Sequence, residues 1–102
     1  MEMIVPTIHM NGTPKDSLCG ALEKATEKIR DAIAAVCATS PNGRDYYPQG
    51  DDAIRSAQDD HYDRLKKLTS VLDDLTDIRI RIEFPEVAGI VEEVFKAMEP
   101  RP

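Results

Sequence analysis

Residues 51–77 read DDAIRSAQDDHYDRLKKLTSVLDDLTD, and the spacing of the apolar positions in this stretch decides the fold. The residues that share one face follow one another in steps of three and four: Ile54, Ala57, His61, Leu65, Leu68, Leu72 and Leu75. Such spacing is close to the heptad pattern of helices that pack side by side. The stretch therefore predicts a long helix, capped by Gly50 or Asp51, whose apolar face needs a partner.

A second long helix is predicted over 14–39. Its start is marked by Thr13, Pro14 and Asp16, because a hydroxyl precedes a proline whose missing N–H costs nothing in the first helical turn. Its apolar residues also repeat in steps of three and four: Leu18, Leu22, Ala25, Ile29, Ala32, Ile33 and Val36. Pro41 disfavours helix at the residue before it, so the helix is expected to end at Thr39 or Ser40.

The two helices have nearly equal predicted lengths, and a connection over 40–50 joins them. This arrangement is typical of an antiparallel helical hairpin. Pro85 opens a further short helix over 85–98. We therefore predict a mainly α fold with a single helical-hairpin domain over 1–102. Three amphipathic helices give only a thin core in a chain of this size, which favours a homo-oligomer.

Two flanking segments are less regular. Residues 3–10 (MIVPTIHM) are rich in β-branched and apolar types and predict a short extended segment. Residues 78–84 (IRIRIEF) fit two states, since their isoleucines alternate as in a strand while Ile78 and Ile82 continue the helical stripe. We favour the strand, which could then pair with 3–10.

Charge and composition limit the classes of function. The 102 residues carry 13 Lys and Arg against 19 Asp and Glu, a net charge of −6, which disfavours binding to duplex nucleic acid. No apolar run approaches the length of a membrane span, and the N-terminus does not resemble a signal peptide, so we expect a cytoplasmic protein that does not contact a membrane. Cys19 and Cys37 would be roughly 27 Å apart along one helix, too far to form a disulfide, and are predicted to be small core residues.

The connection between the helices holds the first candidate ligand-binding residues: Arg44, Asp45, Tyr46, Tyr47 and Gln49. An arginine can pair with a phosphate or carboxylate, a tyrosine offers a planar face and a hydroxyl, and Gln49 can recognise a polar edge. The alternative is structural: the two tyrosines pack over the tip of the hairpin, and Arg44 and Asp45 hold the turn. Contact with another protein is a third possibility.

His9, Asn11 and Thr13 form a second candidate site just before the first helix, because free N–H groups at a helix N-terminus favour anions. Here too a structural role is the alternative, with Thr13 as a cap. The two motifs lie at opposite ends of the first helix. An antiparallel oligomer could place the 42–50 loop of one subunit against the 9–13 helix start of another.

Residues suited to catalysis are present without the spacing that catalysis needs. Asp59 and Asp63 share a helix face with His61 nearby, which superficially resembles a metal site, but a solvated acidic face is the better interpretation. The sequence contains no recognisable nucleophile arrangement. We therefore expect a non-enzymatic protein with no metal and no cofactor.

The pattern I-H-M-N-G-T, then a helix, then N-G-R-D-Y-Y-P-Q-G and a second long helix resembles small hairpin proteins of tailed bacteriophages and prophages. It is similar to the anti-defence sponge proteins of that group, which sequester the nucleotide signals of bacterial immunity: cyclic ADP-ribose isomers in Thoeris and cyclic oligonucleotides in CBASS. The resemblance covers roughly residues 7–75. It implies an oligomer in the bacterial host cytoplasm that binds a small anionic cyclic nucleotide without turnover.

A protein–protein interaction module is the alternative function. Such a module would be an inhibitor whose acidic face binds a host defence protein, or a structural or assembly component of a phage.

Overall fold

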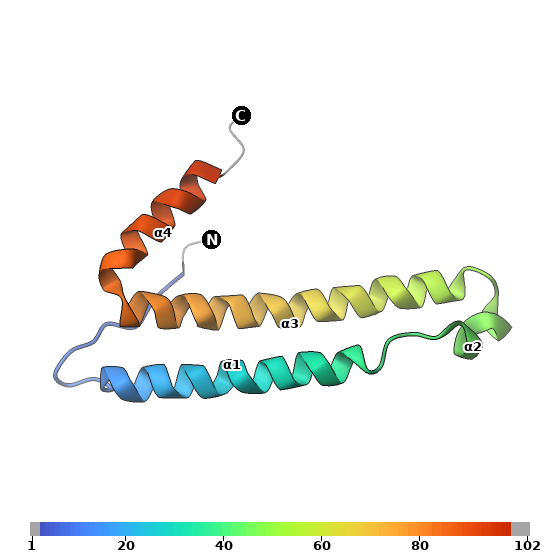
Figure 1. The fold of residues 1–102 in the computed structure, drawn as a ribbon, viewed down its shortest axis with the longest axis horizontal. Helices are drawn as coiled ribbons and strands as arrows, with labels where there is room; N and C mark the ends of the chain where they lie inside the picture. The colour runs from blue at the N-terminus through green and yellow to red at the C-terminus, as the bar shows by residue number, and fades with distance from the viewer. Residues whose placement is uncertain (1–2, 99–102) are drawn as a thin grey trace. The chain divides into compact units, whose positions relative to one another are not determined.

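A computed structural model describes residues 3–98 (Figure 1). The elements in chain order are α1 (Lys15–Cys37), α2 (Gly43–Tyr46), the 3-10 turn η1 (Tyr47–Gln49), α3 (Ala53–Glu83) and α4 (Pro85–Met98). Two long helices that pack against each other and a short C-terminal helix confirm the predicted fold class. By its contacts the chain divides into unit 1, Met1–Ala25 with Leu75–Pro102, and unit 2, Thr26–Asp74. The single domain predicted for 1–102 stays a prediction.

Helix α1 begins one residue later and ends two residues earlier than predicted. The carbonyl of Pro14 accepts the first helical bond from the N–H of Leu18 (3.1 Å), which places the proline where it needs no donor. At the other end the hydroxyls of Thr39 and Ser40 each donate to a carbonyl of the last turn, at 2.7 Å. These bonds satisfy carbonyls that have no partner inside the helix.

Helix α3 runs to Glu83, and the strand favoured for 78–84 is wrong. Residues 3–10 form no strand either, so no partner for a strand exists among the described residues. Two pairs of side chains support the helix at spacing i,i+4: Arg81 contacts Asp77 at 3.1 Å, and Arg79 contacts Glu83. Phe84 still donates to the carbonyl of Ile80 (2.8 Å), and Pro85, which has no N–H, ends the run.

In unit 1 the first part of α1 lies beside the last part of α3, and polar contacts join them. The Lys15 ammonium donates to the carbonyl of Glu83 (3.2 Å), so it satisfies a free carbonyl at the C-terminus of α3. Arg79 lies 3.9 Å from Glu23. Among the described residues of this unit, the buried hydrophobic ones are Ile82, only 3% exposed, and Cys19, 8% exposed.

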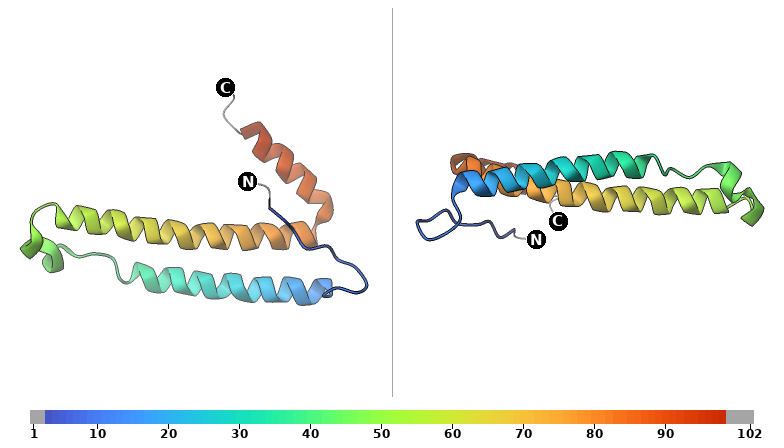
Figure 2. Two further views of the ribbon diagram at one scale, coloured as in Figure 1. Left: turned by 180° about the vertical axis from the view of Figure 1, so that it is seen from behind. Right: turned by 90° about the horizontal axis from the view of Figure 1, so that it is seen from below.

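In unit 2 the later part of α1 and the first part of α3 lie side by side, as two further views show (Figure 2). Its two buried residues are polar: Thr26, 5% exposed, and His61, 8% exposed. Thr26 lies outside the apolar stripe that the sequence predicts for α1. A hydroxyl at this position fits because Ser/Thr side chains in helices can bond back to their own backbone.

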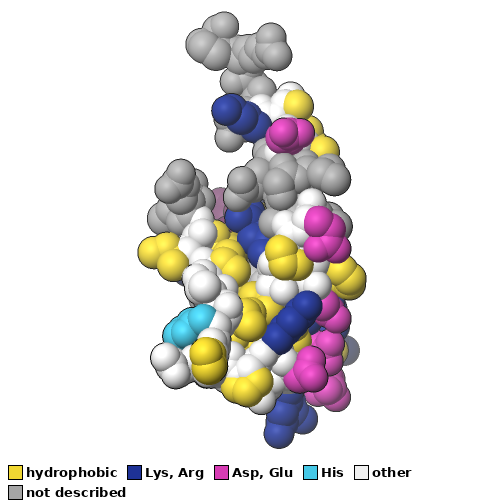
Figure 3. Space-filling view, turned by 90° about the vertical axis from the view of Figure 1, so that its left-hand side faces the viewer, with side chains coloured by type: hydrophobic (Ala, Val, Ile, Leu, Met, Phe, Trp, Pro, Cys, Tyr) yellow, Lys and Arg dark blue, Asp and Glu magenta, His cyan; other side chains and the backbone are white. Residues whose placement is uncertain are grey.

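The predicted apolar stripes face the helix partner, but apart from the buried His61 their side chains are only half-buried. Among the described side chains none is fully buried, and large apolar groups are open to solvent, with Met10 96% and Ile4 92% exposed. Figure 3 shows hydrophobic side chains at the surface between charged ones, viewed from the end where α1 begins. The core prediction for Cys37 is wrong, because this residue lies on the last, exposed turn of α1.

Helix α4 has the predicted bounds. Among its described apolar side chains, Val94 is 52% and Met98 73% exposed. The side chains of 87–92 and 95, which supply most of its predicted apolar face, lie outside the described residues.

Candidate functional site

Hydrogen bonds within the connection between α1 and α3 fold it into two short turns. The side chain of Asn42 caps α2 by accepting from the N–H of Arg44 at 2.9 Å, and the carbonyl of Asn42 accepts from the N–H of Asp45 at 2.9 Å. The following turn, η1, is closed by a bond from the N–H of Gly50 to the carbonyl of Tyr47 (3.2 Å). Gly50 has a φ of 113°, a conformation that a residue with a Cβ rarely adopts. These bonds therefore fix the backbone positions from which the loop side chains extend.

The two adjacent tyrosines differ in their surroundings. Tyr46 is half-buried, which agrees with the alternative in which it packs over the tip, whereas Tyr47 is 76% exposed. Arg44, Asp45 and Gln49 are also exposed. The turn is held by Asn42 and not by the side chains of Arg44 and Asp45, so the structural alternative fails for those two. In the part of the chain that the structure describes, no ion pair involves the Arg44 guanidinium.

A hydrogen bond between side chains attaches the start of this loop to α3. The Ser40 oxygen lies 3.1 Å from Nε2 of His61, and the Ser40 hydroxyl donates to the carbonyl of Cys37. Because a hydroxyl has a single proton, the Nε2–H of His61 donates in this pair and the serine oxygen accepts. His61 occupies a position of the apolar stripe and is buried, which explains why its polar atom needs this partner.

We expect His61→Leu to loosen the loop without unfolding the helices. Leucine suits a stripe position, and the freed Ser40 oxygen is exposed and can bond to water, so the free energy of unfolding should change by less than about 1.5 kcal/mol. The amides of Thr39, Ser40 and Asn42 should exchange with solvent faster. Urea unfolding and hydrogen exchange measure the two effects. Ser40→Ala should reproduce the faster exchange but destabilise more, by about 1–3 kcal/mol, because it leaves the buried Nε2–H of His61 without its partner. Unchanged exchange in both variants would contradict the role of this bond.

The second motif forms a turn before α1. The N–H of Gly12 donates to the carbonyl of His9 (3.1 Å), and the imidazole of His9 lies so close over Gly12 that a Cβ there would meet Nε2 at 2.7 Å. His9, Asn11 and Thr13 are all exposed. This motif belongs to unit 1 and the 42–50 loop to unit 2, with α1 between them in the chain. The site shared between subunits stays a prediction.

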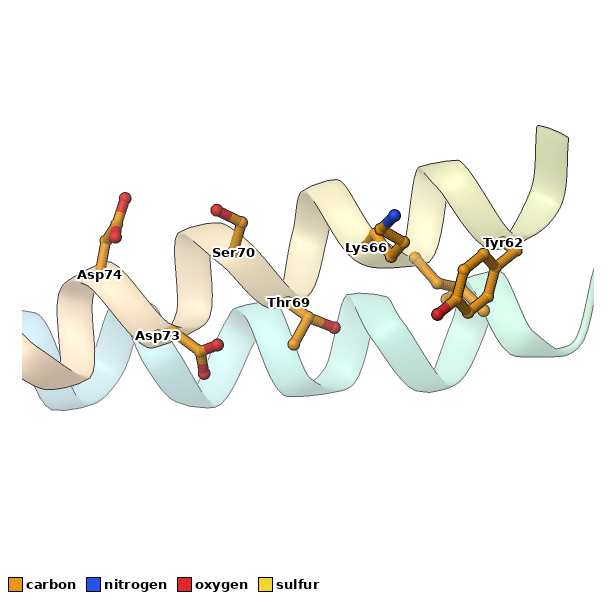
Figure 4. Close-up of a pocket in the computed structure, with 7 residues that line it drawn as sticks. Tyr62, Lys66, Thr69, Ser70, Asp73 and Asp74 are labelled. Carbon is orange, nitrogen blue, oxygen red and sulfur yellow. The ribbon is translucent and has the colours of Figure 1, made fainter. Parts of the chain in front are cut away.

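An open groove on α3 is a feature that sequence reasoning missed. It is lined by Tyr62, Lys66, Thr69, Ser70, Asp73 and Asp74, together with Leu65. Figure 4 shows that Tyr62 and Lys66 lie at one end of this run and the two aspartates at the other. The Lys66 ammonium lies 5.3 Å from the centre of the Tyr62 ring. The available signal in the sequence is the i,i+4 spacing of Tyr62 and Lys66, which places the two side chains side by side on one helix face.

The described residues contain neither a cluster of metal ligands nor a helix that could span a membrane. No three His, Cys, Asp or Glu side chains among them gather where they could hold a metal ion, and Asp59, Asp60 and Asp63 are exposed on α3. No described helix combines the length and the apolar character needed to cross a lipid bilayer.

The fold and the loop define a class: an α-helical hairpin with an exposed cationic and aromatic loop at the connection between its long helices. Comparison of the chain with protein-family models, with curated proteins and with solved structures finds no match.

Proposed function

We propose that this protein binds and sequesters a small cyclic nucleotide, without turnover, through the 42–50 loop. A cyclic nucleotide combines flat bases with anionic phosphates, and it therefore needs an aromatic face and a cation close together. Arg44 would bind a phosphate, Tyr47 would stack on a base, and Gln49 would recognise a polar edge. The resemblance of the two motifs to phage anti-defence sponge proteins supports a cyclic ADP-ribose isomer or a cyclic oligonucleotide as the ligand.

The observation that carries this proposal is the exposure of Tyr47 on an ordered loop. A tyrosine that is 76% exposed contributes little to folding, and its backbone is already fixed by the bonds of α2 and η1. Fixing a binding loop beforehand lowers the entropy that is lost on binding. Since Tyr46 is half-buried and Tyr47 is not, the stacking role falls to Tyr47.

Calorimetric titration of the Tyr47→Ala variant tests the assignment. Loss of one base–aromatic stack costs about 1–3 kcal/mol, so we expect affinity for the bound cyclic nucleotide to fall about 5- to 150-fold. Tyr62→Ala is the matched control, because Tyr62 is another exposed tyrosine (63%) outside the loop. Equal affinities of the two variants would remove Tyr47 from the site.

A protein-interaction module remains the second candidate, and the exposed acidic residues Asp59, Asp60 and Asp63 favour it. On this account the acidic face binds a basic surface of a host protein, and binding weakens strongly with salt. Reversing these three charges would then abolish partner binding, whereas variants of the loop would bind normally.

A further inference from the structure

The α3 groove carries opposite charges at its two ends. Lys66 lies at one end, and Asp73 and Asp74 lie at the other, with the hydroxyls of Thr69 and Ser70 between them (Figure 4). All of these residues belong to unit 2, and all are exposed. None of the ion pairs among the described residues involves these three charged groups.

When two copies of this surface meet in antiparallel orientation, the charges of one copy lie opposite unlike charges of the other. Lys66 and Asp73 are equally distant in sequence from the point between Thr69 and Ser70. If a second α3 runs antiparallel with a two-fold axis at that point, the basic end of each helix meets the acidic end of the other. The same surface patch then serves both copies, as a two-fold interface requires.

The groove also offers apolar surface for such a contact. The Tyr62 ring is 63% exposed, and Leu65 and the methylene chain of Lys66 lie beside it. Tyrosine rings and lysine stems bury apolar area while they keep a polar tip in water. The central residues are Thr69 and Ser70, whose small side chains allow two helices to approach closely.

We propose that this groove is a contact surface between two copies of the chain, formed by antiparallel α3 helices with Lys66 of each copy against Asp73 and Asp74 of the other. The proposal does not depend on the nucleotide ligand of the loop, so ligand binding and self-association can fail separately. It gives the predicted homo-oligomer a defined surface and register.

Charge-reversed variants test the pairing by sedimentation equilibrium. Lys66→Glu makes the groove wholly acidic, and the double variant Asp73→Lys/Asp74→Lys makes it wholly basic, so each alone should self-associate at least tenfold more weakly than wild type. An equimolar mixture of the two variants should form a mixed dimer, because each acidic end then faces a basic one. Lys67→Glu, which changes the charge equally outside the groove, is the control and should associate like wild type.

Several results would overturn the proposal. They are a wild-type protein that is monomeric over the accessible concentration range, a Lys66→Glu variant that associates like the Lys67→Glu control, and an equimolar mixture that stays monomeric. Circular dichroism of each variant confirms that the helices are intact, which is expected because the substituted residues are exposed.

Discussion

Replacing Ile82 with alanine is expected to lower the free energy of unfolding by about 2–5 kcal/mol. Ile82 is 3% exposed and lies near the end of α3, where unit 1 joins that helix to the first part of α1. Removing most of a buried isoleucine loses its transfer free energy and leaves a cavity. Because few hydrophobic side chains are buried among the described residues, this loss is a large fraction of the total stability.

Ile4→Ala is the matched control, because it deletes the same atoms from a side chain that is 92% exposed. We expect a change within about 0.5 kcal/mol. Urea denaturation followed by circular dichroism measures both variants. If Ile82→Ala were no more destabilising than Ile4→Ala, the helical packing of residues 78–83 would be contradicted.

The second large effect is expected for Arg44→Glu, which should reduce affinity for the cyclic nucleotide at least 100-fold. A charge-assisted hydrogen bond to phosphate contributes about 1.5–3 kcal/mol, and glutamate replaces this attraction with repulsion. The guanidinium has no ion pair among the described residues, so stability should be nearly unchanged. Arg44→Lys should keep the charge and lose the bidentate geometry, and so show an intermediate loss.

Arg55→Glu controls for the change in net charge, since Arg55 is exposed on the first turns of α3, outside the loop. It should bind the ligand like wild type. Equal losses in both variants would mean that only overall charge matters and that Arg44 is not part of a site.

The long helices could be predicted because the spacing of their apolar residues and the residues at their ends indicate the same segments. The steps of three and four from Ile54 to Leu75 place half-buried residues at every position except His61, which is buried, and Pro85 begins α4 as expected. Residues 78–84 could not be assigned from the sequence, because alternating arginine and isoleucine satisfies both periods. The i,i+4 contacts of Arg79 and Arg81, and the lack of a strand in 3–10, decide for the helix.

The loop was located from its composition, but its internal order was not predicted. Nothing in the sequence separates Tyr46, which is half-buried, from Tyr47, which is exposed, because they are neighbours in one short segment. The contact between Ser40 and His61 was also missed, since it joins residues that are distant in the chain. Long-range polar contacts leave no local pattern, whereas the cap at Asn42 follows from ordinary turn chemistry.

Retention of an unchanged ligand tests the central claim most directly. A panel of cyclic ADP-ribose isomers and cyclic di- and trinucleotides is incubated with excess protein, and the unbound molecules are removed by ultrafiltration. The protein is then denatured, and the released molecules are identified by mass spectrometry. Sequestration predicts that at least one cyclic nucleotide is retained by wild type but not by Arg44→Glu, and is recovered chemically intact. Passage of the whole panel into the filtrate, or recovery of a cleaved product, would contradict it.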